Sequence, residues 1–174
     1  MIYGCRMLEI LAEMPQIETH LILTDGAKKT LSLETDQTIE QLEKLADVLH
    51  DDHNLAAPIS SGSFNVHGMM VLPCSIKSLS MIANCQGSSL LARAADVTLK
   101  ENRKLILSPR ETPLHLGHLR LMTLAVEQGA LLCPTVPGFY HQPQNITDLI
   151  DHSLGKILDL MGIENQLFQR WGQA

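Results

Sequence analysis

The sequence predicts one α/β domain with a mainly parallel sheet and helices on both faces. Short apolar runs of strand length alternate with helical patterns along the whole chain, without a repeat or a linker. Two of these runs, residues 68–72 and 105–107, are wholly apolar, which is typical of strands covered on both sides. The length of 174 residues also suits a single domain, and we expect residues 1–174 to form it, with a tail at about 163–174.

The first half of the chain is predicted to open with a helix over residues 2–14, where Met7, Leu8, Leu11 and Met14 recur at helical spacing. Residues 17–23 are rich in aliphatic and β-branched side chains and predict a strand. A second helix is expected from Thr38, which has capping-box spacing to Gln41, to about residue 49. Residues 51–64 are polar and predict a loop.

The second half begins with the strand at residues 68–72, which breaks at Pro73. We then expect helix over residues 76–102 with an interruption near Gln86, a strand at 105–107, a helix at 116–128, a strand at 130–133 and a helix at 145–161. Gly129 and Gly162 suit the left-handed positions that end the last two helices. A doubly wound domain normally opens with a strand, whereas this chain opens with a helix.

Composition excludes several classes of function. The net charge of −6 offers no basic stripe for nucleic acid, and aromatic residues are only 3% of the chain. No uncharged stretch is long and apolar enough to span a membrane. Four widely separated cysteines predict reduced thiols and a cytoplasmic protein. Only 18% of the residues are charged, which hints that other subunits cover part of the surface.

Candidate functional residues gather where the predicted strands end, because open parallel sheets bind ligands at the carboxyl ends of their strands. These segments are residues 24–25, 73–78, 110–113 and 134–140. Ser75 begins a helix whose free N–H groups suit an anionic or polar ligand, although it also suits an ordinary helix cap. Arg110 and Glu111 suit phosphate binding and proton transfer, or else a surface ion pair.

Three further patterns allow both a functional and a structural reading. Arg93 and Lys100 lie two helical turns apart and suit a phosphate, or else a solvated helix face. His115 and His118 have no convincing third ligand, so no metal site is predicted. Trp171 packs the C-terminus or stabilises a cation over its indole.

Six motifs together resemble the UbiX-type flavin prenyltransferases, long described as 3-octaprenyl-4-hydroxybenzoate or phenylacrylic acid decarboxylases. The motifs are LSLETD at residues 31–36, PCSIK at 73–77, RAAD at 93–96, LKE at 99–101, RETP at 110–113 and PGFYHQP at 137–143. They occur in the order found in that family, and the resemblance spans residues 2–172.

The resemblance implies a flavodoxin-like, Rossmann-like three-layer αβα fold and a metal-independent transferase. Such an enzyme joins the dimethylallyl group of dimethylallyl monophosphate to N5 and C6 of reduced FMN. The prenylated FMN then serves a UbiD-type decarboxylase in ubiquinone synthesis or aromatic acid decarboxylation. Family members also form dodecamers with the flavin at subunit contacts.

The resemblance also assigns roles to individual positions. Thr24, at a position where the family has Ser, and Arg110 are implied to bind FMN, together with Ser75, Ile76, Lys77 and Ser78. The allylic phosphate is assigned to Arg93, Lys100, Tyr140 and Lys156, the last at a position shared by Arg and Lys. Glu111, Glu34 and Trp171 are implied to lie near the reacting centre.

One departure from the family lies at the start of the chain. Family members begin with an apolar strand and a Gly-Ala-Ser-Gly-type loop, and this sequence starts just after them. We therefore expect a sheet that lacks its central strand, in a sequence that is short at its N-terminus or in a truncated relative. Two alternatives to the transferase follow: a flavin-dependent cysteine decarboxylase of the phosphopantothenoylcysteine type, and a truncated non-catalytic FMN-binding subunit.

Overall fold

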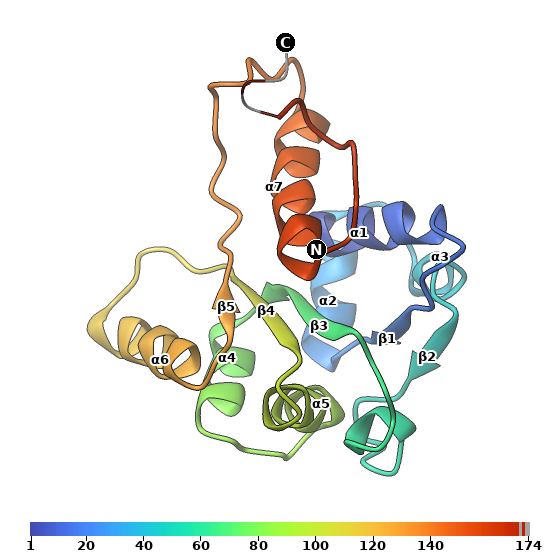
Figure 1. The fold of residues 1–174 in the computed structure, drawn as a ribbon, viewed down its shortest axis with the longest axis vertical. Helices are drawn as coiled ribbons and strands as arrows, with labels where there is room; N and C mark the ends of the chain where they lie inside the picture. Colours follow the sequence, from blue (N-terminus) through green and yellow to red (C-terminus); the bar gives the residue numbers. More distant parts are fainter. Residues whose placement is uncertain (171, 173–174) are drawn as a thin grey trace.

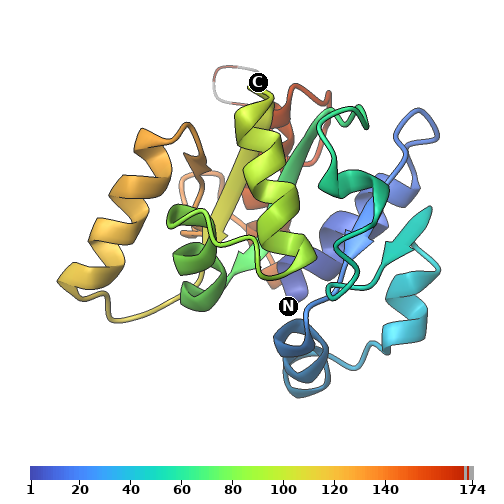
Figure 2. The ribbon, with the colours of Figure 1, turned by 90° about the horizontal axis from the view of Figure 1, so that it is seen from below.

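The computed structural model describes residues 1–170 and 172, and its larger part is a three-layer αβα arrangement (Figures 1 and 2). Three parallel strands in the order β3-β4-β5 form its sheet: β3 (Gly68–Cys74), β4 (Lys104–Pro109) and β5 (Leu131–Leu132). One face carries α4 (Ile76–Ala83), α5 (Leu90–Lys100) and α6 (Leu116–Glu127). The other face carries α1 (Ile2–Ala12) and α7 (Ile146–Met161).

The central strand β4 shows why the apolar run at residues 105–107 predicts a strand buried on both faces. Leu105 and Leu107 pack into the core beneath α4, α5 and α6, whereas Ile106 packs against α1 and α7. Successive side chains of a strand point to opposite faces, so an unbroken apolar run is required where both faces are covered. The predicted α/β class with a parallel sheet is confirmed.

A second, smaller sheet pairs β1 (His20–Ile22) with β2 (Val48–His50), also in parallel. The helices α2 (Asp25–Glu34) and α3 (Ile39–Glu43) connect these two strands. Met1 and Cys5 of the first helical turn pack with Leu31 and Leu42, which joins α1, α2 and α3 in a small core of their own.

Two predictions for this smaller part are wrong. The helix α2 was not expected, and the helix predicted from Thr38 to residue 49 ends at Glu43. Of the ten residues of α2, Leu31 is the one that is buried, so the helix carries almost no apolar stripe. The other helix ends early because Asp47 accepts hydrogen bonds from the amide and hydroxyl of Thr19, which aligns Val48 as the start of β2.

The remaining elements agree with the predictions, apart from shorter ends. Thr38 and Gln41 form the expected capping box, and the break after α4 falls near Gln86. Gly129 and Gly162 have φ angles of 104° and 80°, the left-handed conformation expected after α6 and α7. The loop at residues 51–64 contains one 3₁₀ turn, Pro58–Ser60.

The two sheets do not join. Within the described residues, β1 pairs with β2 alone and β3 pairs with β4 alone, so the facing edges of β1 and β3 have no strand between them. This split is the arrangement expected when the central strand of a doubly wound sheet is absent from the sequence. Among the described helices, none is long and apolar enough to cross a membrane.

Candidate functional site

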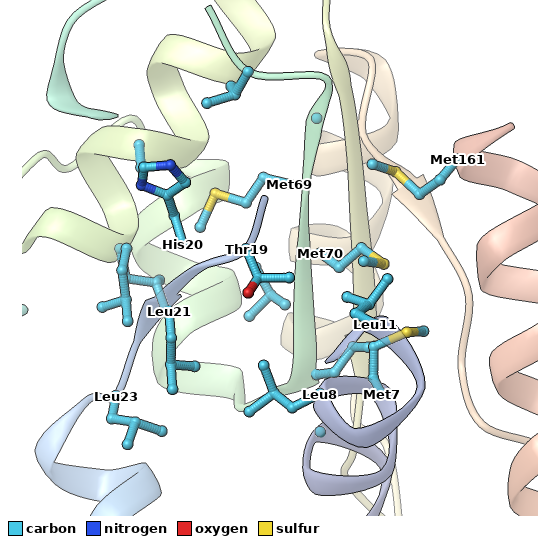
Figure 3. A pocket seen from close by; sticks show the side chains of 18 of the residues that line it. Met7, Leu8, Leu11, Thr19, His20, Leu21, Leu23, Met69, Met70 and Met161 are labelled. Carbon is cyan, nitrogen blue, oxygen red and sulfur yellow. The ribbon is translucent and has the colours of Figure 1, made fainter. Parts of the chain in front are cut away.

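A cavity of about 920 Å³ lies between the edges of β1 and β3. Figure 3 shows Leu21 and Leu23 on the β1 side, Met69 and Met70 on the β3 side, and Leu11 of α1 below them. These walls are apolar, and the strand edges that border them carry backbone groups that no neighbouring strand pairs. The middle of the cavity therefore has the shape and chemistry of a slot for one more strand.

The polar part of the cavity lies where the strands end, as the sequence predicts. Thr24 follows β1, Ser75 and Ser78 follow β3, Arg110 follows β4, and all four line the cavity. Thr24 accepts a hydrogen bond from the amide of Ala27 and thereby caps α2. Ser75 caps α4 by accepting a bond of 3.1 Å from the amide of Ser78. Both hydroxyls are therefore held in place as helix caps while they face the cavity.

Arg110 and Glu34 form an ion pair at this polar edge. The guanidinium Nη2 lies 3.0 Å from Glu34 Oε1, and half of the Arg110 side chain remains exposed. The N-terminal ammonium of Met1 also contacts Glu34. The hydrogen bond from that ammonium, together with the charges of the ammonium and Arg110, holds the pKa of Glu34 below its usual value. Glu34 is therefore a carboxylate beside Arg110 at neutral pH.

Three residues assigned near the flavin lie outside this cavity. Ile76 and Lys77 line a separate shallow hollow between α4 and α6, beside His115 and His118. Glu111 is exposed, and its carboxylate accepts a hydrogen bond from the amide of Thr112. The chain thus places Glu111 next to Arg110 but turned to solvent.

Two of the phosphate-site candidates lie on α5. Arg93 donates to the carbonyl of Ser60 at 3.2 Å and to Asp96 at 2.8 Å. Lys100 pairs with Glu101, and its ammonium lies against Gly62. The predicted shared face is present, since both cations lie along the segment that contains the 3₁₀ turn.

The other two phosphate-site candidates lie on the α7 side of the sheet. The hydroxyl of Tyr140 is hydrogen-bonded to Nε2 of His152 at 2.8 Å, and Lys156 follows one turn later on α7. Because α5 and α7 cover opposite faces of the sheet, one chain does not bring all four candidates together. Trp171 lies outside the described residues.

Histidines are the residues that sequence reasoning missed. His20 and His50 stack on paired strands with their rings 5.1 Å apart, and burial lowers the pKa of His50. His141 and His152 stack on the other side of the molecule. Their separations of 30 and 11 residues have no periodicity, so the first pair requires the strand register and the second the loop before α7. Among the described residues, no cluster of three metal ligands forms around His115 and His118 or elsewhere.

A three-layer fold with hydroxyls and an arginine at the strand ends defines an α/β flavoprotein, and the Flavoprotein family model matches residues 1–155. The flavin prenyltransferase UbiX of Escherichia coli K12 is 54% identical over 175 residues, which cover 99% of this chain and 93% of that relative. UbiX of Thauera aromatica is 52% identical over 170 residues, covering 98% and 87%. The chain therefore belongs to the UbiX flavin prenyltransferases.

Solved structures agree with this assignment. A UbiX protein in complex with FMN and dimethylallyl pyrophosphate is 43% identical and superposes with a TM-score of 0.96, covering 98% of this chain and 90% of that one. A dodecameric FMN-dependent UbiX-like decarboxylase from Escherichia coli O157:H7 is 42% identical, with a TM-score of 0.95 and coverages of 98% and 92%. The FMN-dependent cysteine decarboxylase TvaF is 14% identical with a TM-score of 0.65, which is a likeness of fold alone.

Proposed function

We propose that this chain transfers the dimethylallyl group of dimethylallyl monophosphate to reduced FMN, and that its product serves a UbiD-type decarboxylase. The observation that carries the proposal is the convergence of Thr24, Ser75, Ser78 and Arg110 at one edge of the sheet, in a chain that belongs to the flavin prenyltransferases. The cysteine decarboxylase alternative is not favoured, since its structural relative shares only the fold.

The polar edge fits FMN in its chemistry. Two fixed hydroxyls and the start of α4 offer hydrogen bonds to a polar ring, and the half-exposed guanidinium of Arg110 suits an anionic or carbonyl oxygen. Reduced FMN, when bound, supplies the electron-rich ring that accepts the prenyl group. The chain's own part is to orient that ring and to hold Glu34 as a carboxylate beside it.

The allylic phosphate needs cations because the leaving group carries away negative charge. We assign this role to Arg93, Lys100, Tyr140 and Lys156. Because the first two lie on the opposite face of the sheet from the others, a complete phosphate site requires residues from neighbouring copies of the chain. The dodecamer of a 42%-identical relative supports this arrangement, and we propose the same assembly here.

Proton transfer is assigned to Glu111 and Glu34, and stabilisation of the developing allyl cation to Trp171. Glu111 faces solvent in the single chain, which places it where an adjoining copy would cover it. We also propose that the reaction takes place in the cytoplasm, which accords with four cysteines that are all free thiols.

A coupled assay tests this function. The chain is incubated without oxygen with FMN, a reductant and dimethylallyl monophosphate, and the filtrate is added to a UbiD-type decarboxylase that lacks its cofactor. We expect decarboxylation only when both the chain and the allylic substrate are present. Dimethylallyl pyrophosphate in a parallel reaction distinguishes the two donors. An inactive decarboxylase after every incubation would contradict the proposal.

A further inference from the structure

A cluster on the α7 side joins Tyr140 to two histidines that the reaction scheme does not use. His152 is 7% exposed, and its Nε2 is hydrogen-bonded to the Tyr140 hydroxyl at 2.8 Å. The ring of His141 stacks on that of His152 with centroids 4.4 Å apart and planes 7° from parallel. Phe168 closes another side of His152 with its edge, at 4.9 Å.

The surrounding structure holds His152 firmly. A side chain at Gly155, one turn later, would collide with the Phe168 ring, because a Cβ there would lie 2.5 Å from two ring carbons. The glycine thus lets the C-terminal segment lie directly against α7. By contrast, Tyr140 comes from an exposed loop and is itself 63% exposed. The hydrogen bond therefore ties an exposed phenol to a fixed, buried imidazole.

We propose that His152 is a positioning residue that holds the Tyr140 hydroxyl toward the allylic phosphate, an inference that rests on the proposed function. When Nε2 of His152 donates to the phenol oxygen, the phenol's own proton is left to donate to a phosphate oxygen. A protonated His152 must donate in this direction, and it also brings a positive charge toward the phosphate.

The groups around His152 set its protonation. Lys156 lies on the same helix, His141 and Tyr140 face it from the loop, and Arg170 lies behind Phe168, where it pairs with Asp159. Burial, followed by the charges of His141 and Lys156, lowers the pKa of His152, so the ring is neutral at pH 7. An anionic phosphate near Tyr140 opposes these effects and favours the protonated ring.

Two consequences follow for the kinetics. Loss of the hydrogen bond should raise the KM for dimethylallyl monophosphate about threefold to tenfold with little change in kcat, the usual scale of one net hydrogen bond. The KM of the unchanged protein should also fall as the pH is lowered from 8 to 6, because protonated His152 attracts the phosphate.

The experiment compares His152→Leu, which cannot bond the phenol, with His152→Gln, which keeps a donor but does not titrate. We expect His152→Leu to raise KM and His152→Gln to restore it. The Gln variant should show a weaker pH dependence, and since phosphate ionisation is common to both proteins, the difference reports His152. Ser153→Ala is the matched control, because Ser153 is equally buried on α7 and bonds the Leu149 carbonyl.

A double-mutant cycle with Tyr140→Phe decides whether His152 acts through the phenol. His152→Leu should have no further effect on KM in the Tyr140→Phe background. Additive effects, or equal pH profiles for His152→Gln and the unchanged protein, would overturn the proposal.

A readout without turnover separates this inference from the proposed function. The ¹⁵N resonance of His152 Nε2 should move when Tyr140 becomes Phe, and an unmoved resonance would overturn the hydrogen bond. Absence of any prenyl transfer by the unchanged protein, with the resonance shift present, would refute the proposed function instead.

Discussion

At the scale of single residues, Arg93 and Lys100 bear most directly on how the allylic phosphate is held. Both lie on α5, are roughly half exposed and already have acidic partners in the single chain. Neither lines the cavity whose polar edge is assigned to FMN. Their assignment therefore predicts that substrate use and flavin binding respond differently to their removal.

Replacing Lys100 or Arg93 by Ala should weaken the use of dimethylallyl monophosphate at least tenfold while leaving FMN binding nearly unchanged. The reason is that a charge-assisted contact to phosphate contributes about 1.5–3 kcal/mol. Steady-state kinetics and flavin fluorescence titration measure the two quantities. Lys104→Ala serves as the control, since Lys104 is an exposed cation at the start of β4. Equal loss of flavin binding would return both residues to a structural role.

Glu111 offers a test that separates binding from chemistry. Glu111→Gln keeps the shape of the side chain but removes the base, so product formation should slow by roughly 10²-fold or more with FMN still bound. The carboxylate contacts only the neighbouring Thr112 amide among the hydrogen bonds of the described chain, so folding should be unaffected. Stopped-flow absorbance of the flavin measures the rate. Unchanged turnover would exclude the proton-transfer role.

At the scale of secondary-structure elements, the strongest apolar patterns were enough to predict β3, β4, α5 and α7. The helix α2 was missed because its sequence is polar on nearly every side and its place is set by Leu31 packing on α1 and α3. The strand β2 was read as helix because the capping box at Thr38 starts a real helix but says nothing about where it ends. The contact that ends it, Asp47 with Thr19, spans 28 residues and has no local pattern.

The same contact predicts a pH dependence of the smaller sheet. Hydrogen bonds from the amide and hydroxyl of Thr19 hold the pKa of Asp47 below its ordinary value of 3.8. A depressed pKa means that the stabilisation is fully present above that value and is lost as the pH falls through the lower pKa of the folded state. Asp47→Asn should therefore destabilise the β1–β2 pair at pH 7 and have less effect near pH 3.

Amide hydrogen exchange at Val48, whose N–H bonds the Thr19 carbonyl, measures this local stability. Asp36→Asn is a suitable control because it changes charge equally on a nearby loop. An Asp47→Asn effect that is the same at both pH values would contradict the argument.

At the scale of the whole molecule, the sequence predicted which strand ends carry the polar groups but not which residues meet across copies. Thr24, Ser75, Ser78 and Arg110 follow strands of one sheet direction, so topology alone brings them together. The four phosphate-site candidates have no such relation, because α5 and α7 lie on opposite faces (Figure 2). Their convergence depends on assembly, which no pattern within one chain encodes.

Assembly of the phosphate site from neighbouring copies predicts complementation between inactive variants. Lys100→Ala and Lys156→Ala proteins, dissociated and reassembled together, should regain part of the activity because some sites then receive both intact residues. Each variant reassembled alone is the control. Mixed assemblies that are no more active than the separate variants would place all four residues in one chain.

The split sheet predicts the effect of supplying a strand. Each buried backbone group left unpaired costs about 1–3 kcal/mol, and the facing edges of β1 and β3 present several. Adding an apolar strand and a Gly-Ala-Ser-Gly loop ahead of Met1 should therefore raise the melting temperature and the affinity for FMN. A scrambled extension with Pro in place of the apolar residues is the control. Equal melting temperatures and equal FMN affinities would contradict this view of the cavity.

The central claim, that this chain prenylates FMN, is tested most directly by the mass of the flavin after one anaerobic incubation with reduced FMN and dimethylallyl monophosphate. The proposed chemistry predicts a flavin that is heavier by one five-carbon unit, formed only when the protein and the allylic substrate are both present. Recovery of unmodified FMN from a protein that binds both substrates would contradict the claim.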